Sequence, residues 1–436
     1  MTALLSRAPQ HFIDQLRELG GRGYVVRRPG GQLEASHPAL EELRQFCVDD
    51  ARDFLDHDGL FFAVGPESGA LLAAFVHDTT RGQAAGGLRH WPYATLEAFV
   101  RDGLRLAVGM TRKNATAGLW WGGGKGIIAL REDAAWRERA YRDVVYAEYG
   151  QFVSSLNGCY VTAEDAGTTP PDMRMVFSQT RHTTCIPATQ GGSGNPSGPT
   201  ALGVVCAMEA ALDVLGKGTL EGKRIGMQGA GNVATFMMEA LLARGVASIV
   251  ASDINATRLD EVRTRLGDER VQLRHCAPDD DSIVETPCDV FAPNALGGLL
   301  NPNTIGRLRT PIVCGAANNQ LLDDERDMRA LVERGITYVP DFVANRMGIV
   351  NCANEGYGHV PDDPAIARHL GRAWEHSVFH ATARVLRHAS QTGQTTAEAA
   401  NALADGLARQ PHPVWPERGR QIIEGLVASG WATASS

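Results

Sequence analysis

The chain lacks the features that mark membrane and secreted proteins. No stretch of its 436 residues approaches the 18 or so consecutive apolar residues of a membrane-spanning helix. The N-terminus has no basic flank followed by a long apolar run, so no secretory signal is expected. The sequence also contains no internal repeat and no low-complexity segment. These absences predict a globular protein without a membrane partner.

An excess of positive charge is also missing. The 42 lysines and arginines are outnumbered by 50 aspartates and glutamates, and the net charge of −8 argues against general binding to nucleic acid. The eight cysteines are scattered, and none forms a Cys-x-x-Cys pair. The sequence therefore predicts neither a metal site nor a disulfide framework. A reduced, cytoplasmic protein fits this pattern best.

The most informative segment that is present runs from Lys113 to Lys125, and its last four residues are Gly-Gly-Gly-Lys. Three consecutive glycines are costly to order, and they allow a ligand to lie against bare backbone. A lysine confined in such a place can have its pKa lowered from about 10.4 toward about 7–8, where it exchanges protons near neutral pH. The alternative is a glycine turn that ends in a solvated lysine.

The first half of the chain predicts a mixture of strands and helices. Residues 60–77 contain two apolar runs on either side of a Pro-Glu-Ser-Gly turn, which predicts a hairpin. The spacing of apolar residues predicts helices over 96–111 and about 133–155, and a strand over 160–162 follows. The turn-rich segment 191–199 indicates a domain boundary.

The second half of the chain predicts a parallel sheet. Short apolar runs alternate with helical patterns at the spacing of βαβ units, which places helices on both faces of the sheet. A helix is expected over 235–244. The expected strands are 224–228, 248–252, 289–292, 312–315 and 337–340.

A dinucleotide-binding fingerprint lies in this second half. Gly229 and Gly231 stand between a strand and a helix, and Asp253 ends the next strand. Gly229 would make the tight turn, Gly231 would let backbone N–H groups reach a pyrophosphate, and Asp253 would bind the ribose hydroxyls. A carboxylate there repels a 2′-phosphate, which favours NAD over NADP. NADP stays possible if Arg258 turns toward the site, and a glycine-rich turn that binds nothing is the structural alternative.

Six ordered motifs run from about His77 to Gly358 across both halves. They occupy residues 77–91, 110–125, 162–169, 193–201, 229–234 and 316–321. Together they resemble the glutamate/leucine/phenylalanine/valine dehydrogenase superfamily, and the chain looks closer to its leucine and phenylalanine branch than to glutamate dehydrogenase.

The resemblance implies an α/β fold with two domains. The first is a mixed α/β domain for substrate binding and oligomerisation, and the second is a Rossmann-type, doubly wound parallel-sheet domain that binds NAD. It also implies a homo-oligomer whose size is left open. The expected segments are an N-terminal extension of unknown role (1–60), the substrate and oligomerisation domain (61–198), the NAD domain (199–345), and C-terminal helices that pack back across both domains (346–436).

The activity implied by the resemblance is NAD-dependent oxidative deamination of an L-amino acid to a 2-oxo acid and ammonia. Lys113 would hold the substrate α-carboxylate, Lys125 would activate water, and Asp165 would move protons to and from the amino group. For Asp165, capping of the turn after its strand is the alternative. Thr200 and Asn318 would hold the nicotinamide carboxamide and ribose. The remaining expected cofactor residues are Gly229, Gly231, Asn232, Val233, Asp253 and Ala316.

The substrate side chain is expected to be apolar, either branched or aromatic. In the family, the residue before the Gly-Gly of the first motif contacts that side chain, and glutamate dehydrogenases have a lysine there. This chain has Ala85 before Gly86, so a second substrate carboxylate would be buried without a partner, at a cost of several kcal/mol. Ala163, Ile349 and Cys352 are the other expected pocket residues.

Four large residues depart from the pattern of the leucine branch. Arg346 and Met347 replace small residues, and Trp120 and Trp121 replace smaller residues in the glycine loop. Arg346 either points away, toward a carboxylate on a neighbouring domain, or faces the pocket and favours a dicarboxylic or unusual amino acid. The tryptophans either pack in the core or narrow the cleft. A non-catalytic NAD-binding regulator, motivated by the N-terminal extension, is the third hypothesis.

Overall fold

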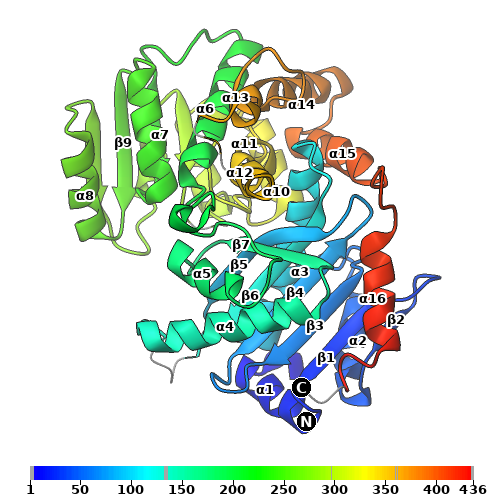
Figure 1. Ribbon diagram of the computed structural model, residues 1–436. Coiled ribbons are helices and arrows are strands. Elements are labelled where there is room, and N and C mark those ends of the chain that lie inside the picture. The colour runs from blue at the N-terminus through cyan, green and yellow to red at the C-terminus, as the bar shows by residue number, and fades with distance from the viewer. Residues whose placement is uncertain (1–3, 132–135, 296, 359, 361, 434–436) are drawn as a thin grey trace. The chain divides into compact units, whose positions relative to one another are not determined.

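The chain folds into two compact units in the computed structural model (Figure 1). The structure describes residues 4–131, 136–295, 297–358, 360 and 362–433. Unit 1 comprises Met1–Asn195, Cys352–His359 and Asp405–Ser436, and unit 2 comprises Pro196–Asn351 and Val360–Ala404. The N-terminal extension expected at residues 1–60 is, from residue 4 onward, part of unit 1. Among the described helices, none has both the length and the apolar composition needed to cross a lipid bilayer.

Unit 1 is built on a mixed sheet of seven strands. Their bounds are β1 (Arg22–Arg27), β2 (Leu33–Ala35), β3 (Gly59–Val64), β4 (Leu71–Asp78), β5 (Ala84–Trp91), β6 (Gly122–Ala129) and β7 (Tyr160–Glu164). The spatial order is β2-β1-β3-β4-β6-β5-β7, in which β5 pairs parallel with β6 and β7 and the other pairs are antiparallel. The predicted hairpin over 60–77 is confirmed as β3 and β4.

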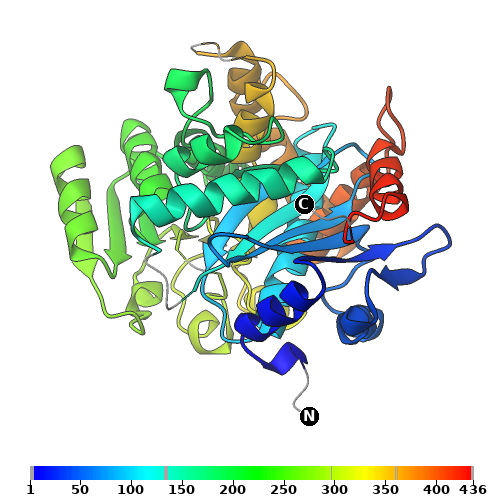
Figure 2. The same ribbon diagram turned by 60° about the horizontal axis from the view of Figure 1, so that its bottom comes forward.

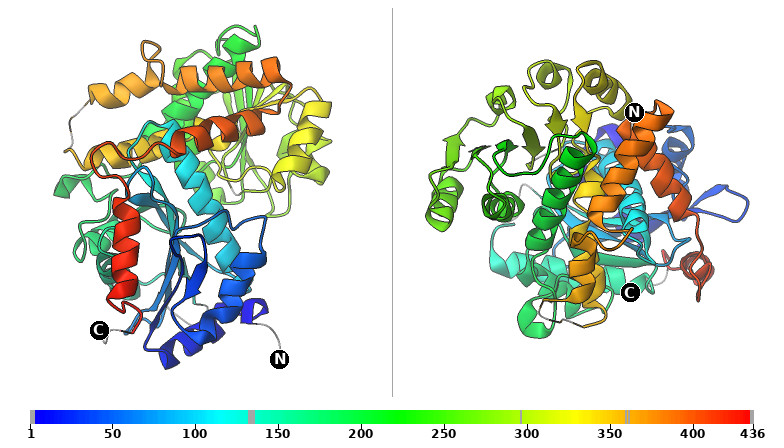
Figure 3. Two further views of the ribbon diagram at one scale, coloured as in Figure 1. Left: turned by 90° about the vertical axis from the view of Figure 1, so that its right-hand side faces the viewer. Right: turned by 90° about the horizontal axis from the view of Figure 1, so that it is seen from above.

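Helices cover both faces of this sheet. They are α1 (Pro9–Glu18), α2 (Glu41–Asp49), α3 (Leu96–Thr116), α4 (Arg139–Ser155), α5 (Pro170–Phe177) and α16 (Arg418–Ala428), with short 3-10 helices at Leu4–Ser6, Pro38–Leu40 and Ala188–Gln190. The alternation of side chains along β3 separates the two faces. Phe62 packs edge-on against Phe12 of α1, whereas Phe61 packs against Trp431, which follows α16. Helices α1 and α3 therefore share one face, and α4 and α16 share the other (Figures 2 and 3).

The helix predicted over 96–111 is confirmed as α3, which continues to Thr116, and Asn114 in its last turn donates to the carbonyls of Ala85 and Gly122. The helix predicted over about 133–155 is found as α4, which begins at Arg139. Residues 132–135, where its start was predicted, lie outside the described residues.

The glycine-rich segment before Lys125 is the first part of strand β6. This strand lies between β4 and β5, and all of its residues are buried. A Cβ atom on Gly123 would overlap the backbone of Thr111 in α3, and one on Gly124 would lie 2.8 Å from the ring of Tyr160. The glycine turn with a solvated lysine, considered as the alternative, is wrong, because Gly123 and Gly124 make room for packed protein atoms on both faces of a strand.

Unit 2 is built on a parallel sheet of six strands. Their bounds are β8 (Arg224–Gln228), β9 (Ser248–Asp253), β10 (Val271–His275), β11 (Val290–Pro293), β12 (Ile312–Val313) and β13 (Thr337–Tyr338). The order β10-β9-β8-β11-β12-β13 is that of a doubly wound fold, in which the chain direction of strand addition reverses between β8 and β11. The predicted fold class is confirmed in both units.

The helices of unit 2 connect these strands and extend beyond them. They are α6 (Ser197–Val214), α7 (Asn232–Ala243), α8 (Ala256–Leu266), α9 (Pro302–Ile305), α10 (Asp324–Glu333), α11 (Asp341–Ala344), α12 (Met347–Glu355), α13 (Pro364–Leu370), α14 (Val378–Thr392) and α15 (Thr396–Ala408), with a 3-10 helix at Ser282–Glu285. The boundary between the units falls inside α12, after Asn351, and inside α15, after Ala404. The chain thus passes between the units within regular helices at these two places.

Candidate active site

A buried lysine and an aspartate meet at one edge of the sheet of unit 1. Lys125 lies on β6, and Asp165 directly follows β7, two strands away. The Nζ atom of Lys125 is 2.7 Å from Oδ2 of Asp165, and the lysine side chain is only 3% exposed. The structure therefore brings together the two residues that the sequence had suggested as the proton-transfer pair.

The two groups shift each other's protonation. Burial lowers the pKa of Lys125 from its ordinary value, and the nearby charge of Asp165 opposes that shift without cancelling it. Burial alone would raise the pKa of Asp165, but the positive charges of Lys125 and Arg89 outweigh it and hold that pKa below its usual range. A carboxylate thus faces an amine that loses its proton more readily than a solvated lysine.

Arg89 on β5 is a third member of this cluster, which the sequence motifs contained without indicating a role. Its Nε atom donates to Oδ2 of Asp165 at 3.3 Å, and its Nη1 atom lies 2.9 Å from the Asp102 carboxylate. The hydroxyl of Tyr93 donates to the same carboxylate at 2.6 Å. The carboxylate of Asp102 therefore fixes the side chain of Arg89 while the Nε atom of Arg89 contacts Asp165.

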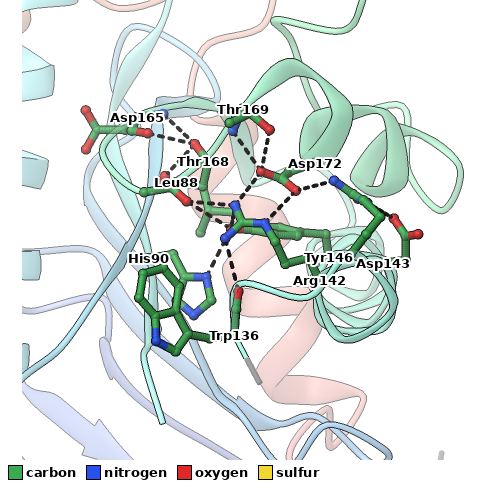
Figure 4. A network of polar contacts seen from close by, with 12 residues as sticks. Leu88, His90, Trp136, Arg142, Asp143, Tyr146, Asp165, Thr168, Thr169 and Asp172 are labelled. Carbon is green, nitrogen blue, oxygen red and sulfur yellow. Dashed lines mark hydrogen bonds and ion pairs between the residues drawn. The ribbon is translucent and has the colours of Figure 1, made fainter. Parts of the chain in front are cut away.

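The loop that carries Asp165 is anchored by a second polar network (Figure 4). The backbone N–H of Asp165 donates to the hydroxyl of Thr168 at 2.9 Å, and that hydroxyl donates to the Leu88 carbonyl of β5. Further along, Arg142 of α4 binds the buried Asp172 carboxylate, which caps α5. Turn capping is thus performed by Thr168 and Asp172, and the Asp165 carboxylate stays directed at Lys125.

The other expected substrate-binding residues of unit 1 lie on elements next to this pair. Ala85 and Gly86 are on β5, and Ala163 is on β7; all three are buried. Lys113 is half-buried near the end of α3. The adjacent Asn114 donates to the carbonyl of Ala85 at 3.2 Å, which fixes this end of α3 against β5.

Glu164, the residue before Asp165, is a feature that the sequence reasoning missed. Its Oε1 atom accepts a hydrogen bond from Asn195 at 3.1 Å, whereas its buried Oε2 atom has no hydrogen-bond partner among the described residues. Burial, with a contribution from nearby carboxylates, raises the pKa of Glu164 to about 8. Unit 1 therefore presents two adjacent carboxyl groups whose pKa values are shifted in opposite directions.

The glycine-rich turn of unit 2 has the conformation of a nucleotide-binding turn. Gly229 has a φ of 93°, which favours glycine, and it follows directly after β8. The N–H of Ala230 donates to Oδ2 of Asp253 at 2.8 Å. A Cβ atom on Gly231 would meet no other atom within 4 Å, so open space lies beside the N-terminus of α7, where Asn232 and Val233 form the first turn.

Unpartnered polar atoms mark the point where the strand order of unit 2 reverses. Gln228 ends β8 and Asn294 follows β11, and these strands are neighbours. The Oε1 atom of Gln228 and the Nδ2 atom of Asn294 are buried without a hydrogen-bond partner among the described residues. The open space at Gly231 and these two atoms fit a dinucleotide, whose pyrophosphate would meet the helix N-terminus and whose polar groups would pair the free donor and acceptor.

Two asparagines connect the expected nicotinamide residues to this edge. The Nδ2 atom of Asn345 donates to the carbonyl of Ala316 at 3.0 Å and to Oδ1 of Asn318 at 2.9 Å. The N–H of Ala316 donates to Oδ1 of Asn294 at 2.8 Å. Asn294 and Asn345 were not predicted from the sequence, since only the fold brings them beside Ala316. Thr200 of α6, also in unit 2, donates its hydroxyl to the carbonyl of Pro196, the residue before that helix.

Arg258, which had left NADP open, lies against the glycine-rich turn. Its Nε atom donates to the carbonyl of Ala230 at 3.1 Å, and Nη2 donates to the hydroxyl of Thr235 at 2.9 Å. Its Nη1 atom forms an ion pair with Glu261 at 2.8 Å. The guanidinium therefore contacts the turn at Ala230 and α7 at Thr235, while Glu261 of its own helix pairs with its charge.

The large residues that depart from the family pattern have distinct surroundings. Arg346 is fully buried in unit 2, donates to the backbone carbonyl of His376, and has its pKa lowered to about 9 by burial. Trp120 is exposed in unit 1, where the guanidinium of Arg81 lies 4.3 Å from its ring. Ile349 and Cys352 are buried three positions apart on α12, on either side of the unit boundary.

Comparisons with known proteins agree with this arrangement. Residues 191–406 match the family model described as glutamate/leucine/phenylalanine/valine dehydrogenase, and residues 70–182 match the model of the dimerisation domain of these dehydrogenases. The two matches fall on the regions that hold the glycine-rich turn and the lysine–aspartate pair.

Individual relatives match over most of their length. The chain is 41% identical to the leucine dehydrogenase of Thermoactinomyces intermedius over 71% of this chain and 81% of that protein. It is 36% identical to the phenylalanine dehydrogenase of Lysinibacillus sphaericus over 79% of this chain and 87% of that protein. The crystal structure of L-tryptophan dehydrogenase from Nostoc punctiforme matches with a TM-score of 0.63 and 31% identity, over 81% of this chain and 96% of that one.

Proposed function

Because the chain belongs to the glutamate/leucine/phenylalanine/valine dehydrogenase family and is an amino acid dehydrogenase, we propose that it catalyses the reversible, NAD-dependent oxidative deamination of an apolar L-amino acid. The products are the 2-oxo acid and ammonia. The observation that carries this proposal is the buried contact of 2.7 Å between Lys125 and Asp165. A proton-transfer pair of this kind is what deamination requires, because an amine must lose protons and a water must be activated.

The roles of the residues follow from their chemistry. Lys113 supplies a fixed cation for the α-carboxylate of the substrate. Asp165, which stays ionised, accepts a proton from the substrate ammonium group. Lys125, whose pKa is lowered, takes a proton from the water that attacks the imine. A bound nicotinamide would supply the acceptor for the hydride of the α-carbon.

An apolar substrate is supported by the chain and by its relatives. Ala85 is a small apolar residue at the position where glutamate dehydrogenases place a lysine, so no cation is supplied there for a second carboxylate. Relatives at 33–41% identity are named leucine and phenylalanine dehydrogenases, and one at 34% is named L-tryptophan dehydrogenase. We propose a branched-chain or aromatic amino acid, with Ala163, Ile349 and Cys352 as the further pocket residues.

NAD is the proposed cofactor, held at the carboxyl ends of β8 and β11. The carboxylate of Asp253 repels a 2′-phosphate, and Arg258 is engaged by the glycine-rich turn and by Glu261. Thr200, Asn232, Val233 and Asn318 complete the proposed cofactor contacts. The match to a dimerisation domain supports assembly with further copies of this chain, and the eight free cysteines support a reduced, cytoplasmic location.

The proposal is tested by incubating the purified protein with NAD and a panel of L-amino acids at alkaline pH. We expect the absorbance of reduced nicotinamide to rise with leucine, phenylalanine or similar substrates, and to rise far less with glutamate. The exposed Lys217 provides a matched control, since Lys217→Met should keep the activity that Lys125→Met loses. A preference for glutamate, or no absorbance change with any amino acid, would contradict the proposal.

A further inference from the structure

Two cysteines from distant parts of the sequence lie in contact inside unit 1. The Sγ atoms of Cys185 and Cys352 are 2.9 Å apart, although 167 positions separate the residues. Both side chains are buried, and Cys352 is 3% exposed. A disulfide has an S–S length of about 2.05 Å, so bond formation requires a movement of less than about 1 Å.

Local contacts hold the two cysteines against each other. The carboxylate of Glu355, three positions after Cys352 on α12, accepts a hydrogen bond from the backbone N–H of Cys185 at 2.9 Å. The same carboxylate oxygen accepts bonds from the N–H and the hydroxyl of Ser193 at 2.7 and 2.6 Å. The backbone of Cys185 has a φ of 62°, a conformation that a non-glycine residue keeps only where its surroundings impose it. Glu355 therefore ties the backbone of Cys185 to the helix that carries Cys352.

Other buried cysteines of the chain have different partners. The Sγ atom of Cys314 donates to the carbonyl of Val204 at 3.8 Å, and that of Cys206 donates to the carbonyl of Leu370 at 3.3 Å. The sulfur atoms of Cys314 and Cys206 each contact a backbone carbonyl oxygen, whereas the sulfur atom of Cys185 contacts a second sulfur. Cys314 is thus a suitable control for burial without a neighbouring thiol.

We propose that Cys185 and Cys352 form a reversible intramolecular disulfide by exchange with a low-molecular-weight disulfide. One protein thiolate attacks the small disulfide, forms a mixed disulfide and releases one small thiol. The second protein thiol then displaces the other small thiol. Two protein S–H bonds are lost and one protein S–S bond forms, and the two electrons and two protons end on the two small thiols.

The location of this disulfide gives it a structural consequence. The chain leaves unit 1 after Asn195 and returns at Cys352, so the bond closes a covalent ring that contains residues 196–351 of unit 2. A cross-link between distant residues removes conformational freedom from the unfolded chain, and the effect grows with the length of the closed loop. The oxidised protein should therefore resist thermal unfolding more than the reduced protein.

The surroundings of the pair also set its rate of reaction. The hydrogen bond with Cys352, together with burial, raises the pKa of the Cys185 thiol well above its usual value. Since the thiolate is the attacking species, exchange should be slow at neutral pH and accelerate as the pH rises. The pair should therefore oxidise only during prolonged exposure to a disulfide, unlike an exposed thiol of low pKa, which reacts quickly.

The test is incubation of the folded, full-length protein with glutathione disulfide, followed by intact-mass measurement and peptide mapping. We expect a mass lower by two hydrogens, a linked peptide that contains Cys185 and Cys352, and a thermal midpoint higher by about 3–8 °C. Dithiothreitol should reverse all three changes. After cleavage within residues 196–351, the fragments should stay joined on a non-reducing gel and separate on a reducing gel.

Variants assign the effect to this pair. Cys352→Ser should lose both the linked peptide and the rise in midpoint, whereas Cys314→Ser should keep both. If a variant does not fold, the peptide map of the unmodified protein decides alone. The proposal is overturned by a mixed disulfide that does not resolve, by a link to another cysteine, by an unchanged midpoint after oxidation, or by the absence of any link after a day of exposure.

Discussion

The two candidate sites satisfy their polar groups in opposite ways. In unit 1, Lys125 and Arg89 both donate to the carboxylate of Asp165, and Arg89 also donates to Asp102. In unit 2, by contrast, buried polar atoms at the ends of β8 and β11 have no hydrogen-bond partner among the described residues. The charges of Lys125, Asp165 and Arg89 are therefore paired, although the neighbouring Glu164 keeps one unpartnered oxygen, whereas the amides of Gln228 and Asn294 in unit 2 each have an unpartnered atom.

This difference separates a site prepared for chemistry from a site prepared for binding. A charge network that is complete without ligand keeps its geometry at the moment of reaction, which is where electrostatic catalysis gains most. A buried polar atom without a partner costs about 1–3 kcal/mol, and a ligand that pairs with it recovers part of that free energy. Substitutions in unit 1 should therefore act on the rate, and substitutions in unit 2 should act on cofactor affinity.

The largest expected effect is that of Lys125→Met. Removing the amine leaves Asp165 without its proton-transfer partner, so kcat should fall about 10³-fold or more. The dissociation constant of NAD, measured by quenching of protein fluorescence, should change less than about two-fold, because the cofactor residues are in unit 2. A parallel loss of NAD affinity would show that the two functions are not divided in this way.

The second largest effect is expected from replacing a glycine by alanine in each site, and the two substitutions should give opposite results. In Gly123→Ala the new methyl group overlaps the backbone of Thr111, so the free energy of unfolding in urea should fall by about 3 kcal/mol. In Gly231→Ala it enters open space, so stability should change by less than about 0.5 kcal/mol while NAD binds about ten-fold more weakly.

Gly109→Ala is the control for this pair, since Gly109 lies on α3 and no atom lies within 4 Å of the position that its new methyl group would take. It should be neutral or slightly stabilising, because alanine favours a helix more than glycine does. Equal losses of stability at Gly123 and Gly231 would contradict the contrast between a packed strand and an open cofactor turn.

The fold of unit 2 was more predictable than that of unit 1, and the reason is physical. Parallel strands buried on both faces appear as short apolar runs, so 224–228 and 248–252 were located to within a residue. β5 and β6 were not predicted as strands, because glycine has little intrinsic preference for a strand. Their conformation depends on α3 and on Tyr160, which approach from other parts of the chain.

The site residues also divide into those that the sequence indicated and those that only the assembled fold shows. Lys125 stood out in its Gly-Gly-Gly-Lys segment, but its pairing with Asp165 came from the family resemblance, since forty positions separate them and no local pattern joins them. Arg89 stood inside a recognised motif, but its partners Asp102 and Asp165 become visible only when β5, β7 and α3 are assembled. The unpartnered amide of Asn294 is likewise a property of the assembled sheet edge, which no sequence pattern encodes.

A smaller effect, on pH dependence, is expected from Arg89→Leu. The pKa of Asp165 is held below its usual range by Lys125 and Arg89, so removing the arginine should raise it. The acid limb of kcat/KM should move to higher pH by about one unit, with about ten-fold less activity on that limb. Because the folded pKa is depressed, Asp165 stabilises the fold above its unfolded pKa and loses this contribution as the pH falls through the folded pKa. The variant should therefore lose stability at a higher pH than the unmodified protein.

Arg244→Leu is the matched control for Arg89→Leu, because Arg244 forms a comparable half-buried ion pair with Glu209 in unit 2. It should lower stability modestly and leave the acid limb of kcat/KM in place. Arg89→Lys should restore part of the profile, since it keeps the charge. An acid limb that does not move in Arg89→Leu would mean that Lys125 alone sets the protonation of Asp165.

The smallest expected effect is the change in the free energy of unfolding caused by Gln228→Met, and the sign of this change is the most informative result. In Gln228→Met a side chain of similar shape replaces one whose buried Oε1 atom has no hydrogen-bond partner among the described residues. The free energy of unfolding without cofactor should rise by about 0.5–1 kcal/mol, while the dissociation constant of NAD rises about five-fold. The exposed Gln272 of β10 is the control, and Gln272→Met should change neither quantity. A residue that weakens the free protein and strengthens the complex is retained for its ligand. If Gln228→Met instead destabilises the free protein, solvent already satisfies that oxygen, and the contrast between a complete site and an incomplete one fails.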